Sequence, residues 1–162
     1  MSNSEEEHLV YLGLGSNIDP EIYLPKAVDC LKENIEVVAV SSAWQTPAVG
    51  SSGEDYLNAV MLVRVTCLPK ELKQRVVSYI EGELDRVRTE NKFADRTIDI
   101  DILISDNQVL DPEIWNYAHM AVPLAELCPD ISPSPTGETI QQTAQRLSTL
   151  TNIQARPDLP LG

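Results

Sequence analysis

The sequence predicts an α+β fold of the ferredoxin-like type, a βαββαβ sandwich with helices packed on a largely antiparallel sheet. Two helical stretches separate four runs of apolar, often β-branched residues, which lie at positions 9–14, 35–46, 56–66 and 96–103. The chain has 162 residues and no apolar run long enough to span a bilayer. This length predicts a single domain over residues 9–150, with tails at 1–8 and 151–162.

The first strand ends in a glycine-containing turn at residues 13–17, which permits close approach to the backbone. Asp19 as N-cap and Pro20 at the first helical position then predict a helix to about Asn34. The valine-rich run at 35–46 predicts the second strand, which Pro47 closes.

The third strand, at residues 56–66, carries the polar Asn58 near its start. Pro69 begins a second helix with one apolar residue every four positions, which indicates a single buried stripe formed by Leu72, Val76, Ile80 and Leu84. After the fourth strand, Asp106-Asn107 predicts a turn. A short helix at 123–127, a loop at 132–137 and a last helix at 138–147 complete the chain.

Composition excludes several classes of function. The chain has 12 Lys and Arg against 25 Asp and Glu, a net charge of −13, which opposes nucleic-acid and anionic-membrane binding. Aromatic residues make up only 5%, so the RNA-binding modules that share this topology are disfavoured. Three cysteines without C-x-x-C spacing indicate neither disulfides nor zinc, and with no signal peptide they predict a cytoplasmic protein.

Asp99 and Asp101 lie two residues apart in the fourth strand, so both side chains point to one face. Adjacent carboxylates repel each other and are costly to desolvate, and a divalent cation relieves both effects. Such a pair could instead protect an exposed edge strand, although lysine is commoner there.

Basic residues cluster just before this strand. Residues 86–96 hold Arg86, Arg88, Lys92 and Arg96 against Glu90 and Asp95, whereas residues 97–145 contain no Lys or Arg. Because arginine recognises phosphate well, the pattern predicts an anion site beside a magnesium site.

Six ordered segments together resemble the 6-hydroxymethyl-7,8-dihydropterin pyrophosphokinase family of folate biosynthesis. They are Gly15-Ser16-Asn17, Thr46-Pro47, Tyr56-Leu57-Asn58, Glu81, Arg86-Val87-Arg88 and R-T-I-D-I-D at residues 96–101. The likeness covers residues 10–130 and is most specific in the last segment. It implies transfer of pyrophosphate from ATP to the hydroxymethyl oxygen of a reduced pterin, with release of AMP.

The resemblance also implies residue roles. Two Mg²⁺ ions would bind Asp99 and Asp101, and the catalytic set would be Arg86, Arg88, Arg96, Asp99 and Asp101. ATP would contact Glu81, Arg88, Arg96, Ile102 and His119. The pterin would contact Gly15, Thr46, Pro47, Val49, Tyr56, Asn58 and Phe93.

Three departures from the family pattern concern the substrates. Phe93 stands where tryptophan is usual, and Asp95 replaces a usual proline. After His119 the chain reaches Pro123 almost directly, without the family's arginine and pterin-stacking phenylalanine, which predicts a more open site. A pyrophosphokinase for another small alcohol and a non-catalytic nucleotide-binding relative are therefore the alternatives, and a monomer is favoured.

Overall fold

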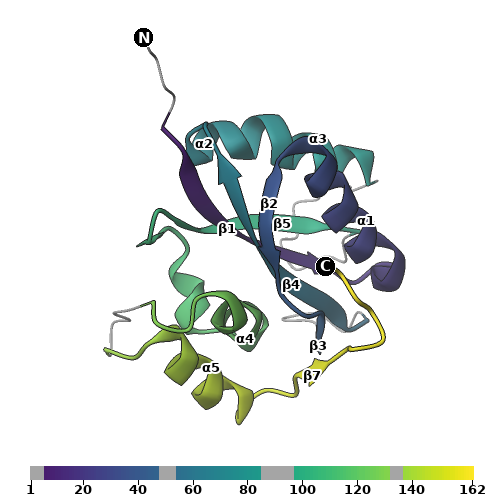
Figure 1. The fold of residues 1–162 in the computed structure, drawn as a ribbon. Coiled ribbons are helices and arrows are strands. Elements are labelled where there is room, and N and C mark those ends of the chain that lie inside the picture. The colour runs from purple at the N-terminus through teal and green to yellow at the C-terminus, as the bar shows by residue number, and fades with distance from the viewer. Residues whose placement is uncertain (1–5, 48–53, 85–96, 132–136) are drawn as a thin grey trace, which may run out of the picture.

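A computed structural model describes residues 6–47, 54–84, 97–131 and 137–162 of the chain. One sheet runs through the molecule, with helices on both of its faces (Figure 1). The strands are β1 (His8–Ser16), β2 (Glu36–Val40), β3 (Trp44–Thr46), β4 (Tyr56–Val65), β5 (Asp99–Ser105), β6 (Gln108–Val109) and β7 (Gln154–Ala155). The helices are α1 (Pro20–Asn34), α2 (Pro69–Leu72), α3 (Ser78–Glu83), α4 (Ala118–Leu127) and α5 (Ile140–Ser148).

The strand order is β6-β5-β1-β4-β3-β7, and β2 also pairs with β4. Every pairing within the described residues is antiparallel. The four predicted strands thus form the ferredoxin-like arrangement, in which the first strand lies between the third and the fourth. The predicted fold class is confirmed.

The predicted second strand is divided into β2 and β3. Between them, the backbone N–H of Ser41 donates to the Val60 carbonyl at 2.9 Å, and the Ser41 hydroxyl accepts from the Val60 N–H at 2.9 Å. A side chain thus replaces one backbone partner, so the regular ladder is interrupted while the backbone groups of Val60 stay satisfied.

The predicted second helix contains a π-helical turn, η1 (Lys73–Val77), between α2 and α3. A π turn holds one more residue than an α turn, which shifts the buried face by one position. Val77 is therefore fully buried in place of the predicted Val76, while Leu72, Ile80 and Leu84 are buried as expected. The N-cap of α1 also differs, because Asp19 adopts a left-handed conformation (φ 43°) without a side-chain cap.

Two apolar layers lie on opposite faces of the sheet. The larger packs α1, α2 and α3 against one face, with Leu12, Leu31 and Ile100 among its fully buried side chains. On the other face, α4, α5 and a 3₁₀ turn (Pro112–Trp115) cover only part of the sheet, around Ile104 and Ile114. None of the described helices is long and apolar enough to cross a membrane.

The C-terminal residues contact the sheet, although the sequence predicts a tail there. Strand β7 pairs with β3, and the Arg156 N–H donates to the Ala43 carbonyl at 2.9 Å. Leu159 and Leu161 pack against the larger core. The C-terminal segment therefore runs from the outer side of β3 to the larger core beside α1, where Lys32 donates to the Leu161 carbonyl.

Candidate functional site

The site lies on the less covered face of β1, β4 and β5. In β1, Leu12 and Leu14 point into the larger core, so the alternate residues Gly13 and Gly15 face the other way. Gly15 is paired with Asp99 of β5 on one side and with Asn58 of β4 on the other. The register therefore places a carboxylate and an amide on either side of a glycine.

Gly13 and Gly15 form the floor of this region and, because they have no side chains, leave the space above β1 open. A Cβ atom at Gly15 would lie 3.4 Å from Asn58 Oδ1 and 3.5 Å from Tyr56 Cδ1, and one at Gly13 would lie 3.1 Å from Leu103 Cδ1. Any side chain here would fill the space between β5 and β4. The absence of side chains at Gly13 and Gly15 leaves that space to a ligand.

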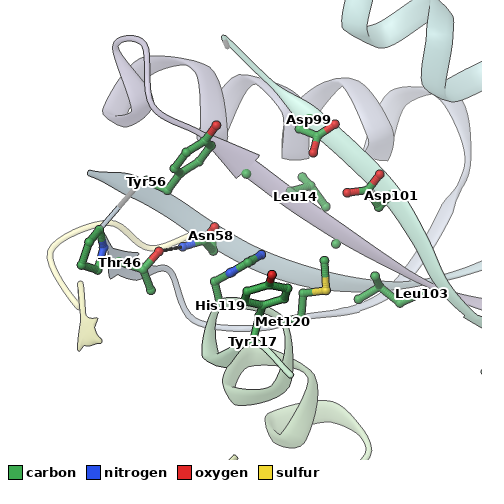
Figure 2. A pocket seen from close by; sticks show the side chains of 13 residues that line it. Leu14, Thr46, Tyr56, Asn58, Asp99, Asp101, Leu103, Tyr117, His119 and Met120 are labelled. Carbon is green, nitrogen blue, oxygen red and sulfur yellow. Dashed lines mark hydrogen bonds between the residues drawn. The ribbon is translucent and has the colours of Figure 1, made fainter. Parts of the chain in front are cut away.

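A cavity of about 190 Å³ stands over this floor (Figure 2). Strands β1, β3, β4 and β5 and the start of α4 contribute its walls. Its lining is Gly13, Leu14, Gly15, Thr46, Pro47, Tyr56, Asn58, Asp99, Asp101, Leu103, Tyr117, His119 and Met120. Eight residues predicted for the site thus meet in one cavity: Gly15, Thr46, Pro47, Tyr56, Asn58, Asp99, Asp101 and His119.

The carboxylates of Asp99 and Asp101 stand together at one end of the cavity, as Figure 2 shows. Burial, and next the charge of Asp99, raise the pKa of Asp101 to about 7, against an opposing effect of Lys73. Ionising the pair is therefore unfavourable without an added positive charge. Because these side chains line a cavity, a ligand site explains them better than protection of a strand edge.

The donor set fits a hard divalent cation completed by a ligand. Carboxylate oxygens are suitable donors for Mg²⁺, which commonly binds one or two carboxylates together with substrate phosphates. Within the described residues, no three His, Cys, Asp or Glu side chains are grouped to hold a metal by themselves. The pair is thus suited to a cation that arrives with, or is completed by, a phosphate-bearing molecule.

Asn58 lies at the other end, almost fully buried at 3% exposure. Its amide nitrogen donates to Thr46 Oγ1 at 2.8 Å and to the Trp44 carbonyl at 3.2 Å. Both acceptors belong to β3, so β3 fixes the plane of the amide. Its Oδ1 is the atom nearest the position of a Gly15 Cβ, so the amide presents an acceptor beside the cavity floor.

The start of α4 forms a wall that the sequence did not predict. The helix begins at Ala118, five residues before the predicted helix at 123–127, and it places Tyr117, His119 and Met120 around the cavity. These three residues therefore wall one side of the cavity. The predicted start is wrong because proline is typical of the first turn of a helix, whereas Pro123 lies inside this one. Tyr117 and Met120 are three residues apart, a spacing that places two side chains on one face of a helix, so this spacing could have indicated the earlier start.

Tyr117 and His119 form a ring pair with centroids 5.4 Å apart and an interplanar angle of 32°. Burial lowers the pKa of His119, with Asp99 and Asp111 acting in the opposite direction. The imidazole is therefore neutral at pH 7, and its ring has an uncharged face and one acceptor nitrogen.

Two predicted residues lie elsewhere. Glu81, only 2% exposed, accepts a hydrogen bond from the Ile100 N–H at 3.1 Å, and the Lys73 ammonium donates to the Ile100 carbonyl at 2.8 Å. Both contacts are on the outer side of β5, and Ile102 packs against the larger core. Five predicted residues are outside the described part of the chain: Val49, Arg86, Arg88, Phe93 and Arg96.

Residues 11–129 match the protein family described as 7,8-dihydro-6-hydroxymethylpterin-pyrophosphokinase (HPPK). A 2-amino-4-hydroxy-6-hydroxymethyldihydropteridine pyrophosphokinase from Synechocystis is 32% identical over 166 residues, covering 96% of this chain and 84% of the relative. Another protein of that name, from Methylorubrum extorquens, is 38% identical over 149 residues, covering 85% of this chain and 92% of the relative.

Among solved structures, wild-type Plasmodium falciparum HPPK-DHPS with pterin and p-hydroxybenzoate is similar in fold, with a TM-score of 0.71 and 11% identity. The match covers 92% of this chain and 44% of that one. This chain therefore spans less than half the length of that structure, and the likeness concerns the fold.

Proposed function

The chain belongs to the 7,8-dihydro-6-hydroxymethylpterin-pyrophosphokinase family, and we propose that it transfers pyrophosphate from ATP to 6-hydroxymethyl-7,8-dihydropterin, releasing AMP, in folate biosynthesis. One observation supports this most: a single cavity joins a carboxylate pair suited to metal and phosphate to an amide and aromatic slot suited to a flat heterocycle. The low floor at Gly13 and Gly15 lets the two halves of the cavity share one ligand assembly.

At the carboxylate end, Asp99 and Asp101 would hold two Mg²⁺ ions together with the ATP phosphates. Bound there, the ions supply positive charge to the phosphate oxygens. In that arrangement the β-phosphorus would face the hydroxymethyl oxygen. The new bond from this oxygen to the β-phosphorus forms as the bond from the β-phosphorus to the α,β-bridging oxygen breaks, so AMP leaves with the bridging oxygen and the hydroxyl proton passes to solvent. Transfer of this kind depends on positioning and charge stabilisation, so no strong base is needed among the side chains.

Arg86, Arg88 and Arg96 are proposed to add positive charge at the phosphates, as the sequence predicts. All three lie outside the described residues, and their guanidinium groups would bind the phosphate oxygens. Glu81 and Ile102 would border the nucleotide at the outer edge of the site, where Glu81 accepts a hydrogen bond from the Ile100 N–H of β5.

At the amide end, Asn58 Oδ1 accepts a hydrogen bond from an N–H of the pterin ring, and Tyr56 stacks on the ring. Asn58 lies between Tyr56 and the Tyr117–His119 pair in Figure 2. We assign the ring pair to the pterin wall as well, in place of the stacking residue that the sequence lacks. His119, expected to contact ATP, borders both substrates in this arrangement.

The test is a direct assay. Purified protein is incubated with ATP, Mg²⁺ and 6-hydroxymethyl-7,8-dihydropterin, and AMP and the pterin diphosphate are separated by chromatography. Equal amounts of both products, dependent on Mg²⁺ and abolished by EDTA, are expected. AMP formed only with another hydroxymethyl compound would instead support a different acceptor. ATP binding without AMP from any acceptor would support a non-catalytic relative.

A monomeric, cytoplasmic protein remains the prediction for its state and location.

A further inference from the structure

The C-terminal segment carries an arginine that joins three parts of the molecule. Arg156 Nη1 donates to Gln45 Oε1 at 2.9 Å, and Nη2 donates to Glu21 Oε2 at 2.6 Å. Two further hydrogen bonds bind Asp158, and the Arg156 side chain is 22% exposed. Its guanidinium is thereby held against both α1 and β3, where its planar set of donors fits several acceptors at once.

Gln45 extends this network to the start of β4. Its Nε2 donates to Asp55 Oδ2 at 2.9 Å, and Asp55 immediately precedes Tyr56. Gln45 also lies between Trp44 and Thr46, which provide the two acceptors of the Asn58 amide. The position of β3 therefore decides where Asn58 points, and Arg156 and β7 hold β3 from its outer side.

We propose that Arg156 is a positioning residue, and that through Gln45 it holds β3 so that Asn58 and Tyr56 are set for the acceptor substrate. The inference rests on the proposed function for the identity of that substrate. The side-chain hydrogen bonds of Arg156 go to Gln45, Glu21 and Asp158, none of which lines the cavity. Its effect should therefore be confined to the pterin end.

The decisive kinetic experiment compares two arginine variants. Arg156→Ala should raise the KM for the pterin about 3- to 10-fold, the loss expected from one or two imperfect hydrogen bonds at the site. Its KM for ATP and its kcat should stay within about twofold of wild type, since only ground-state binding of the acceptor is disturbed. Arg146→Ala is the matched control. Arg146 also pairs with a carboxylate, that of Glu138, but Arg146 belongs to α5 and not to the segment beside β3.

Two more variants locate the effect in the network. Gln45→Ala should reproduce the rise in pterin KM. The pterin KM of the double variant with Arg156→Ala should be no higher than that of either single variant, because both substitutions remove the same Arg156–Gln45 hydrogen bond. Arg156→Lys should recover only part of the pterin affinity. Its ammonium can donate to one or two of the partners Gln45, Glu21 and Asp158, but it cannot reach all three.

Amide hydrogen exchange provides a readout that does not depend on turnover. In Arg156→Ala, residues 44–46 and 57–58 should exchange faster than in wild type, while β1 and β5 remain protected. In Arg146→Ala these amides should be unchanged.

Three results would overturn the proposal: an unchanged pterin KM, an equal rise in the ATP KM, or the same effects in Arg146→Ala. If wild type forms no AMP with the pterin, the proposed function fails instead. Amide exchange then still decides the positioning role, and unchanged protection of β3 in Arg156→Ala would refute it.

Discussion

The two faces of β1 and β5 differ in nearly every property although their residues alternate along the same strands. On the covered face, Leu12, Leu14 and Ile100 are almost fully buried in apolar packing. On the other face, Gly13 and Gly15 offer no side chain, and Asp101 is so unfavourably placed that its pKa rises to about 7. The covered face stabilises the fold through apolar packing. The other face holds a carboxylate whose ionised form is unfavourable there, which is destabilising but suits the binding of a cation.

This comparison shows how a small domain separates stability from chemistry. Because a strand alternates with a period of two, neighbouring residues serve different purposes at no cost in chain length. A substitution at one position should affect folding, and a substitution at the next should affect the reaction. The four predictions below test that separation.

The largest effect is expected at the carboxylate pair. Asp101→Ala should reduce AMP formation by about 1,000-fold or more, since it removes half of the side-chain metal ligands at the phosphates. The assay is initial-rate chromatography at saturating Mg²⁺. Asp106→Asn, in the turn that follows the same strand, is the control and should retain turnover. Near-normal rates in Asp101→Ala would show that the pair does not bind the catalytic metal.

The adjacent position on the covered face should behave in the opposite way. Ile100→Ala should lower the free energy of unfolding by about 2–5 kcal/mol, because it leaves a cavity among close-packed side chains. Urea denaturation measures this. Activity per folded molecule should remain within about threefold of wild type. A loss of turnover comparable to that of Asp101→Ala, in protein shown to be folded, would mean that the faces are not separable.

The same carboxylate should also be a burden on the fold. A raised folded-state pKa means that stability falls as the pH rises from about 4 to about 7, with the whole cost present above pH 7. Asp101→Asn should therefore stabilise the metal-free protein by roughly 1–3 kcal/mol at pH 8 and by much less at pH 5. Urea denaturation in EDTA at both pH values checks this, and equal gains at both would contradict it.

The smallest effect is expected at the floor of the cavity. Gly15→Ala places a methyl group 3.4 Å from Asn58 Oδ1, ordinary contact that needs no backbone change but fills space meant for the ligand. Pterin affinity should fall about tenfold, with stability changed by less than about 1 kcal/mol. Calorimetric titration with Mg²⁺ and a non-hydrolysable ATP analogue measures the affinity. Unchanged binding would place the pterin away from this floor.

The sequence was sufficient for the features that depend on local pattern. Alternation predicted that Asp99 and Asp101 share a face, and the strand and helix order predicted the topology, because both follow from periodicity. The lining by Tyr56 and Asn58 was anticipated only through the family resemblance. Their assigned roles remain predictions.

Features set by long-range contacts could not be foreseen. The division of β2 from β3 depends on Ser41 meeting Val60, and the contacts of Arg156 join residues more than a hundred positions apart. Such features depend on tertiary partners, which local propensity does not encode.

The π turn at Lys73–Val77 has a consequence for how homologous chains are aligned with this one. A relative with one residue fewer between Leu72 and Ile80 can form a regular α-helix there, with its next buried residue one position earlier. The single-residue gap in such an alignment then marks a change of helical winding and not a shorter loop. Deleting one residue from this turn should accordingly be tolerated far better than deleting one from β1, where every later side chain would change faces.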